Sequence, residues 1–264
     1  MAEPSPSPGA PATDAATTNA DGAAPRAWGP WASAGWLVVL LAPALSVRGA
    51  LLAAGGRPGL RVGDLPRALA GAGDLAELAA SGRFAGLGVL IGAPVVLAGV
   101  GLLARARGWP AIAYVGLRPP GLRGLMVAVA GFVAGLLGSD VLTLALGRTL
   151  APPTLMALAL GSPPWLVALA VVVAAPLVEE VLFRGFLYRG LAESPRLGPG
   201  MAIGLTALAW ATSHGADDLY GLATTYLIGL YLGLVRHLTR STATTFLLRA
   251  AAGGAVLAAG LSQG

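Results

Sequence analysis

The chain contains no cysteine and no lysine, and only 11% of its residues are charged. The absence of cysteine excludes disulfides, thiolate metal sites and a cysteine nucleophile. A soluble domain is usually about a quarter charged. The shortage of charge, together with 56% hydrophobic residues and a mean hydropathy of +0.75, therefore indicates an integral membrane protein in contact with the lipid bilayer.

The positive charge is carried wholly by arginine, and the net charge is +5. No arginine-rich run is interleaved with aromatic residues, so the sequence does not favour nucleic acid as a partner. Arginines that flank membrane spans explain the positive net charge. An amino-acid composition without lysine and rich in alanine, glycine and arginine is typical of a GC-rich bacterial genome. We therefore expect an integral protein of the bacterial plasma membrane.

Apolar stretches predict an all-α, polytopic transmembrane bundle of about seven or eight helices, because roughly 20 apolar residues are needed to cross a bilayer core. Residues 1–30 are rich in proline, alanine, serine and threonine and predict a disordered N-terminal tail, which leaves residues 31–264 as the membrane domain. The expected spans are residues 31–47, 84–104, 125–146, 165–183, 201–213, 219–235 and 241–261.

The sequence leaves the orientation of this bundle open. Arginine is frequent both in residues 48–83 and in residues 105–123, which a single span should place on opposite sides of the membrane. Either residues 65–80 hold a further membrane element or the positive-inside rule fails for this chain.

Two adjacent glutamates, Glu179 and Glu180, follow an uncharged run that extends from Trp165 to Val178. A carboxylate at membrane depth costs on the order of several kcal/mol, so it persists only where it faces protein or water. Arg184 follows Glu180 by four residues, and a helix places the two on one face. These residues alone leave two interpretations open: an interfacial ion pair, or a site in which a carboxylate acts as general base toward water.

His214 ends the apolar run of residues 201–213, one helical turn beyond Trp210. The short connection after the glutamate-bearing run favours two antiparallel helices whose ends meet. An isolated histidine at a span end is either interfacial or part of a site. Asp140, inside residues 125–146, could cap a helix break, hydrogen-bond a neighbouring span or join the site. The chain has no phosphate loop, no His-Glu-xx-His pattern and no Gly-x-Ser-x-Gly elbow.

These residues resemble the motifs of a known family. Residues 176–187, PLVEEVLFRGFL, are similar to the first motif, EExxxR, of the CAAX-protease and bacteriocin-processing family (CPBP, also called Abi) of intramembrane proteases. Residues 210–214 resemble its second motif, FxxxH, with tryptophan in place of phenylalanine. Residues 229–233 and 239–241 resemble the small-residue helix and turn before the last motif, and the resemblance covers residues 165–255.

The resemblance implies a polytopic helical fold and endoproteolysis of a membrane-associated peptide or protein substrate, such as a prenylated C-terminal tail or a bacterial peptide. It implies that Glu179 is the general base on water, that Glu180 with Arg184 orients it, and that His214 binds the oxyanion or a metal. A divalent metal such as zinc, with Glu179 and His214 as ligands, is the cofactor that the family suggests. A metal-free glutamate mechanism is the other interpretation.

The chain departs from the family at the last motif. The family has HxxxN there, whereas the aligned residues are Arg249 and Gly253. One histidine and two carboxylates make a poor zinc site. We therefore expect Arg249 to enter the same site, where it either binds the carboxylate of Glu179 or donates to the oxyanion.

Two functions other than proteolysis remain open. One is a catalytically degenerate relative that binds or scaffolds peptides, for example in bacteriocin self-immunity. The other is a transporter or channel with an intramembrane carboxylate relay, which fits the composition, although the sequence shows no inverted repeat.

Overall fold

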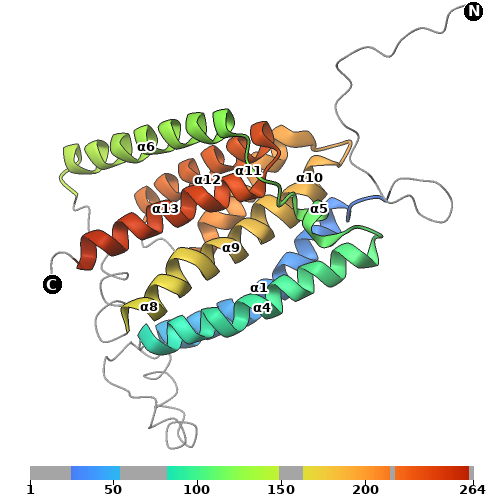
Figure 1. Ribbon diagram of the computed structural model, residues 1–264, viewed down its shortest axis with the longest axis horizontal. Coiled ribbons are helices and arrows are strands. Elements are labelled where there is room, and N and C mark those ends of the chain that lie inside the picture. Colours follow the sequence, from blue (N-terminus) through green and yellow to red (C-terminus); the bar gives the residue numbers. More distant parts are fainter. Residues whose placement is uncertain (1–24, 54–81, 149–162, 215–217, 262–264) are drawn as a thin grey trace, which may run out of the picture.

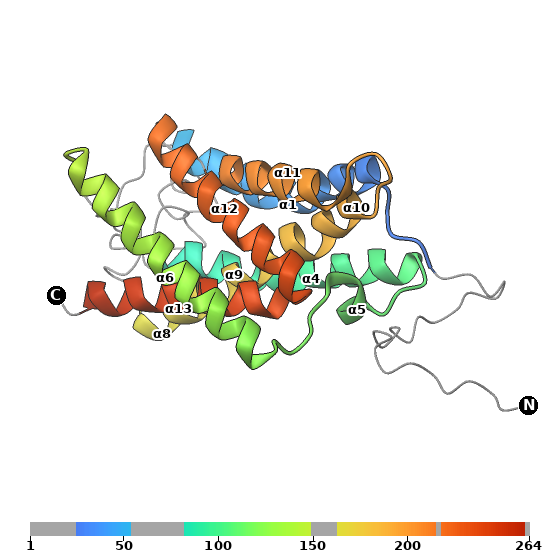
Figure 2. The ribbon, with the colours of Figure 1, turned by 90° about the horizontal axis from the view of Figure 1, so that it is seen from above.

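The computed structural model describes residues 25–53, 82–148, 163–214 and 218–261, and these form helices joined by turns, with no strand among them. The helices are α1 (Pro30–Ala53), α4 (Gly82–Ala106), α5 (Ala111–Val115), α6 (Leu122–Ala145), α8 (Pro164–Val167), η2 (Ala168–Ala174), α9 (Ala175–Glu179), η3 (Glu180–Leu187), α10 (Tyr188–Ala192), α11 (Gly198–Ser213), α12 (Leu219–Thr239) and α13 (Thr242–Leu261). They pack side by side, with α9 between α13 and α4 (Figure 1; Figure 2 gives the view from above). The predicted all-α bundle is confirmed.

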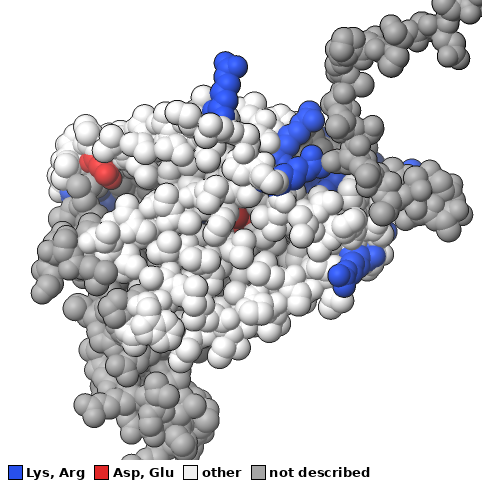
Figure 3. All heavy atoms as spheres, viewed as in Figure 1, with Lys and Arg blue, Asp and Glu red and all other residues white. Residues whose placement is uncertain are grey.

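Each of the seven predicted spans coincides with helical residues. Among the described residues, four helical stretches are long and apolar enough to cross a bilayer: Gly86–Ala106, Leu122–Ala145, Trp165–Ala192 and Leu219–Thr239. In Figure 3 most of the visible face is uncharged, as contact with lipid requires, and the charged atoms lie mainly toward its edges. Most of the predicted disordered tail, residues 1–24, lies outside the described residues. Residues 65–80, for which a further membrane element was one interpretation, also lie outside them.

The helix that carries the glutamates changes its winding at the motif. Both η2 and η3 are π-helical, so their hydrogen bonds run from residue i to i+5 and each turn is wider than in an α-helix. Glu180 and Arg184, four residues apart, both lie within η3. Such turns are frequent at functional sites.

Four fully buried aromatic side chains belong to the main apolar core: Tyr114, Phe183, Phe186 and Trp210. Gly185, between the two phenylalanines, allows η3 to approach the end of α5. A Cβ at this glycine would lie 2.7 Å from the Cβ of Val115, closer than real Cβ atoms come. The missing side chain at position 185 thus sets the distance between η3 and α5.

The turn after α5 ties three helices together. Gly116 has φ 68°, and a Cβ there would overlap the guanidinium of Arg236, whose Nε donates to the carbonyl of Arg184 at 3.0 Å. Thr242, at the start of α13, donates its backbone N–H to the Gly116 carbonyl at 2.9 Å and its hydroxyl to the Val115 carbonyl at 2.5 Å. The turn therefore fixes α12 and α13 against η3.

Candidate active site

The carboxylate of Glu179 lies at the centre of a polar cluster to which α9, α11 and α13 contribute. Its Oε2 accepts hydrogen bonds from the indole Nε1 of Trp210 at 2.8 Å and from Nη2 of Arg249 at 2.5 Å. Nε2 of His214 lies 3.5 Å from the same oxygen. The side chains of Glu179, His214 and Arg249 are 24%, 33% and 22% exposed, so the cluster is only partly buried. The predicted approach of His214 and Arg249 to Glu179 is confirmed.

The ring of His214 is aimed at Glu179 by the backbone of its own helix. Its Nδ1 lies 2.9 Å from the carbonyl oxygen of Trp210, four residues earlier. A carbonyl oxygen can only accept, so Nδ1 carries the proton of this hydrogen bond. Nε2 then faces the carboxylate, and that contact is attractive when Nε2 also carries a proton.

Trp210 packs against three basic side chains near Glu179. The guanidinium carbons of Arg184 and Arg249 lie 4.6 and 4.7 Å from its ring centroid, within cation–π range, and the His214 ring lies at 4.4 Å. In the sequence, Trp210 stands out only as a replacement for phenylalanine, which does not indicate that its indole N–H is a donor to Glu179. The available signal was its position one helical turn before His214.

Glu180 and Arg184 form a second, fully buried pair. Both side chains are 0% exposed, and Nη1 of the arginine lies 3.3 Å from Oε1 of the glutamate. Nη2 of Arg184 donates to the Gly229 carbonyl of α12 at 3.4 Å. Neither oxygen of Glu180 has a hydrogen-bond partner among the described residues, so attraction between the charges holds the pair. The predicted pairing is confirmed, and it joins η3 to α12.

The donor set does not fit a zinc ion. A catalytic zinc site uses three protein ligands, and no group of three histidine, cysteine, aspartate or glutamate side chains that could hold a metal occurs in the described ranges. Glu179 and His214 supply two candidates, and the oxygen between them already binds the guanidinium of Arg249. The chemistry proposed below therefore uses the side chains of the chain alone.

The remaining polar residues singled out in the sequence lie elsewhere. Asp140 is exposed on α6, which continues past it to Ala145, so it neither caps a helix break nor lies in the Glu179 cluster. Gly253, one turn after Arg249, faces η2, and a Cβ there would lie 3.5 Å from the Val171 carbonyl, an ordinary contact distance.

Comparison with known proteins agrees with this cluster. Residues 161–254 match the family model described as Type II CAAX prenyl endopeptidase Rce1-like, and this region contains all of Glu179, Glu180, Arg184, His214 and Arg249. Neither the curated proteins nor the solved structures gave a match. The matched family is one of proteases, and the long apolar helices make the chain an integral membrane protein. The match over residues 161–254 supports membership of the CAAX-protease and bacteriocin-processing family.

Proposed function

We propose that the protein is an intramembrane endopeptidase of the bacterial plasma membrane, in which Glu179 activates water to cleave a membrane-associated peptide or protein. This proposal rests on the way the carboxylate of Glu179 is held, through only one of its two oxygens. Among the described residues, the polar contacts of Glu179 end on Oε2, held by Trp210 and Arg249. A carboxylate anchored through one oxygen presents the other, Oε1, in a fixed direction, and a fixed base is an effective one.

The neighbouring groups suit the rest of the reaction. When water attacks a peptide carbonyl, its proton passes to Glu179 and negative charge develops on the carbonyl oxygen. His214 and Arg249 stand beside the carboxylate and can donate to that oxyanion. Glu179 then returns the proton to the leaving amine as the carbon–nitrogen bond breaks. Glu180 and Arg184 hold the helix in place without touching the substrate.

A second candidate is a relative that binds membrane peptides without cleaving them, as in bacteriocin self-immunity. The contact between Arg249 and Glu179 favours it, because a guanidinium on the carboxylate competes with water for that group. Arg249 is an oxyanion donor in the first candidate and a block in the second.

A cleavage assay tests both candidates. The full-length protein in liposomes is offered a panel of membrane-anchored peptides, including prenylated tails, as wild type and as Glu179→Gln. Glutamine keeps an oxygen for Trp210 and Arg249 but cannot take a proton from water, so we expect a loss of about 10²–10⁴-fold. Glu193→Gln, at an exposed acid outside the cluster, is the matched control and should cleave normally.

The result also separates the two candidates. Peptide binding by wild type and Glu179→Gln alike, with cleavage by neither, would support the peptide-binding relative. Full turnover by a folded Glu179→Gln protein would show that Glu179 is not the base.

A further inference from the structure

The positive charge of the bundle is concentrated at one end. The ends of α4, α10 and α12 and the starts of α1, α6, α11 and α13 meet around α5, and nine arginines lie in or beside them. We call this the arginine end: Arg26, Arg105, Arg107, Arg118, Arg123, Arg189, Arg196, Arg236 and Arg240. Most of these side chains are exposed, and Glu193 is the one acid among the described residues there. In Figure 3 the arginine atoms gather mainly toward the right, where Figure 1 shows α5.

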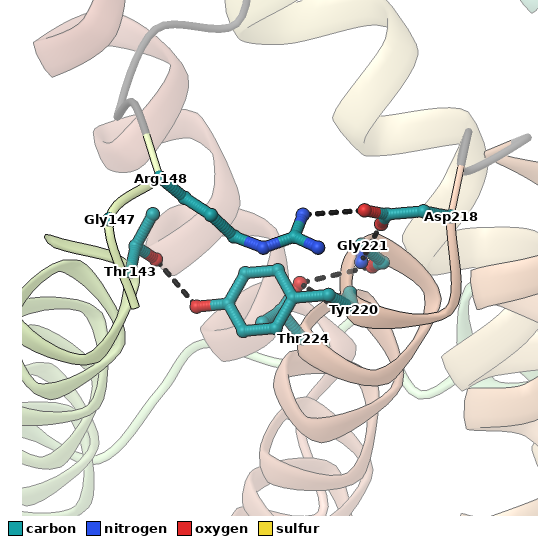
Figure 4. Close-up of a pocket in the computed structure, with 7 residues that line it drawn as sticks. All are labelled: Thr143, Gly147, Arg148, Asp218, Tyr220, Gly221 and Thr224. Atoms are coloured by element: carbon teal, nitrogen blue, oxygen red, sulfur yellow. Dashed lines mark hydrogen bonds and ion pairs between the residues drawn. The ribbon is translucent and has the colours of Figure 1, made fainter. Parts of the chain in front are cut away.

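At the opposite end, the described residues include a pair of opposite charges. Nη1 of Arg148 lies 2.5 Å from Oδ2 of Asp218, and the guanidinium lies over the ring of Tyr220 at 4.5 Å beside a cavity of about 440 Å³ (Figure 4). The pKa of Asp218 is lowered by the backbone N–H of Gly221 and by Arg148. The nine arginines and Glu193 give the arginine end a formal net charge of +8, which exceeds the +5 of the whole chain.

Aromatic rings mark the arginine end as a boundary between membrane and water. The indole Nε1 of Trp28 donates to the Leu103 carbonyl at 2.9 Å, and Arg107 lies over its ring at 5.2 Å. Arg189 lies over the ring of Trp109 at 3.9 Å. Tryptophan anchors at headgroup level, and arginine at cytoplasmic helix ends is the main determinant of orientation.

We propose that the arginine end faces the cytoplasm and that its exposed arginines bind the headgroups of anionic lipids in that leaflet. Guanidinium groups donate to phosphate oxygens in fixed geometry, and each one near an anionic leaflet raises lipid affinity roughly fivefold. α1 then starts at the cytoplasmic side, and α13 ends at the outer side. This assignment settles the orientation that the sequence left open, and it is independent of proteolysis.

The cysteine-free chain allows a direct test of orientation. Pro195→Cys places a thiol in the turn between α10 and α11 at the arginine end, and Leu146→Cys places one at the exposed end of α6. Each variant is expressed in bacterial cells and treated with a membrane-impermeant maleimide. We expect Leu146→Cys to react in intact cells and Pro195→Cys to react only after the cells are opened. The reverse pattern would overturn the proposal.

The lipid contact is tested with the full-length protein in phosphatidylcholine vesicles, using spin-labelled phosphatidylglycerol to measure its association constant with the protein. Arg123, Arg196 and Arg240 are exposed at the arginine end, and all three are changed to glutamine together. We expect the preference for the anionic lipid to fall at least fivefold. Arg148→Gln removes one exposed arginine from the opposite end and should leave the preference unchanged. An unchanged preference in the triple variant, or a loss in Arg148→Gln alone, would contradict the lipid-binding surface.

Discussion

Trp210 donates its indole N–H to Oε2 of Glu179 across 2.8 Å. The family motif has phenylalanine at this position, which has no such donor. Arg249, the other departure from the family motifs at this carboxylate, donates to the same oxygen. The two departures thus act on one atom, and this relationship predicts how variants of the site will behave.

We predict that Trp210→Phe lowers kcat about 10–100-fold and leaves KM nearly unchanged. The phenyl ring keeps the contact with both guanidinium groups, whereas the lost hydrogen bond to a charged acceptor contributes roughly 1.5–3 kcal/mol. Hydrolysis rates and thermal unfolding measured together check this. Trp165→Phe changes a 66% exposed tryptophan in α8, at the start of the helical stretch that carries Glu179, and is the control. An unchanged kcat in Trp210→Phe would show that the indole N–H does not position Glu179.

We expect Glu180→Gln and Arg184→Gln each to lower the free energy of unfolding by about 3–5 kcal/mol, because each leaves one buried charge without its partner. The double variant should be less destabilised than the sum of the two, since it strands no charge. Denaturant unfolding in detergent measures all three. Arg148→Gln breaks an exposed pair and should cost about 0–1 kcal/mol. Additive losses at positions 180 and 184 would mean that the two side chains do not interact.

Gly185→Ala is predicted to destabilise the protein by about 1–3 kcal/mol, because the new methyl group would overpack against Val115 and push η3 away from α5. Cleavage should fall as well, since η3 directly follows Glu179. The control is Gly138→Ala on α6, where a Cβ meets nothing within 4 Å. Equal unfolding temperatures for the two variants would show that the close approach of η3 to α5 tolerates a side chain.

Much of the fold could be predicted because the bilayer sets the length of an uncharged helix. The expected span 84–104 lies within α4, and the span 219–235 lies within α12. The contact between Glu179 and His214 could also be predicted, because a short connection between two apolar runs makes their helices lie antiparallel. Residue type and spacing carried both inferences.

The remaining features of the fold and the site could not be predicted, because they depend on contacts between residues that no sequence pattern indicates. Glu180 and Arg184 share a face in an α-helix as in a π-helix, so their spacing gave no sign of the π winding of η3. Gly185 looked like one small residue among many, and its importance comes from Val115, distant in sequence. Asp140 had three open roles, and its exposed position on α6 follows from how few residues of that helix are buried.

Arg249→His combined with Gly253→Asn restores the last family motif and separates the two candidate functions. Position 253 accepts a Cβ at ordinary contact distance, so backbone overlap does not prevent the change. If Arg249 donates to the oxyanion of an active enzyme, as we propose, we expect cleavage to fall about 10²–10³-fold, the usual cost of one such donor. Arg249→Gln, which removes the charge but restores no motif, should show a similar loss and is the matched control.

A gain of cleavage in the restored variant would instead show that the guanidinium blocks Glu179 and would favour the peptide-binding relative. Peptide binding measured beside cleavage distinguishes a blocked base from a misfolded protein, because a blocked site still binds. Thermal unfolding adds a readout that is independent of the substrate, since Arg249 also lies over the Trp210 ring at 4.7 Å and its replacement removes that contact. If the double variant alters neither turnover nor unfolding temperature, the contact between Arg249 and Glu179 has no role in either function.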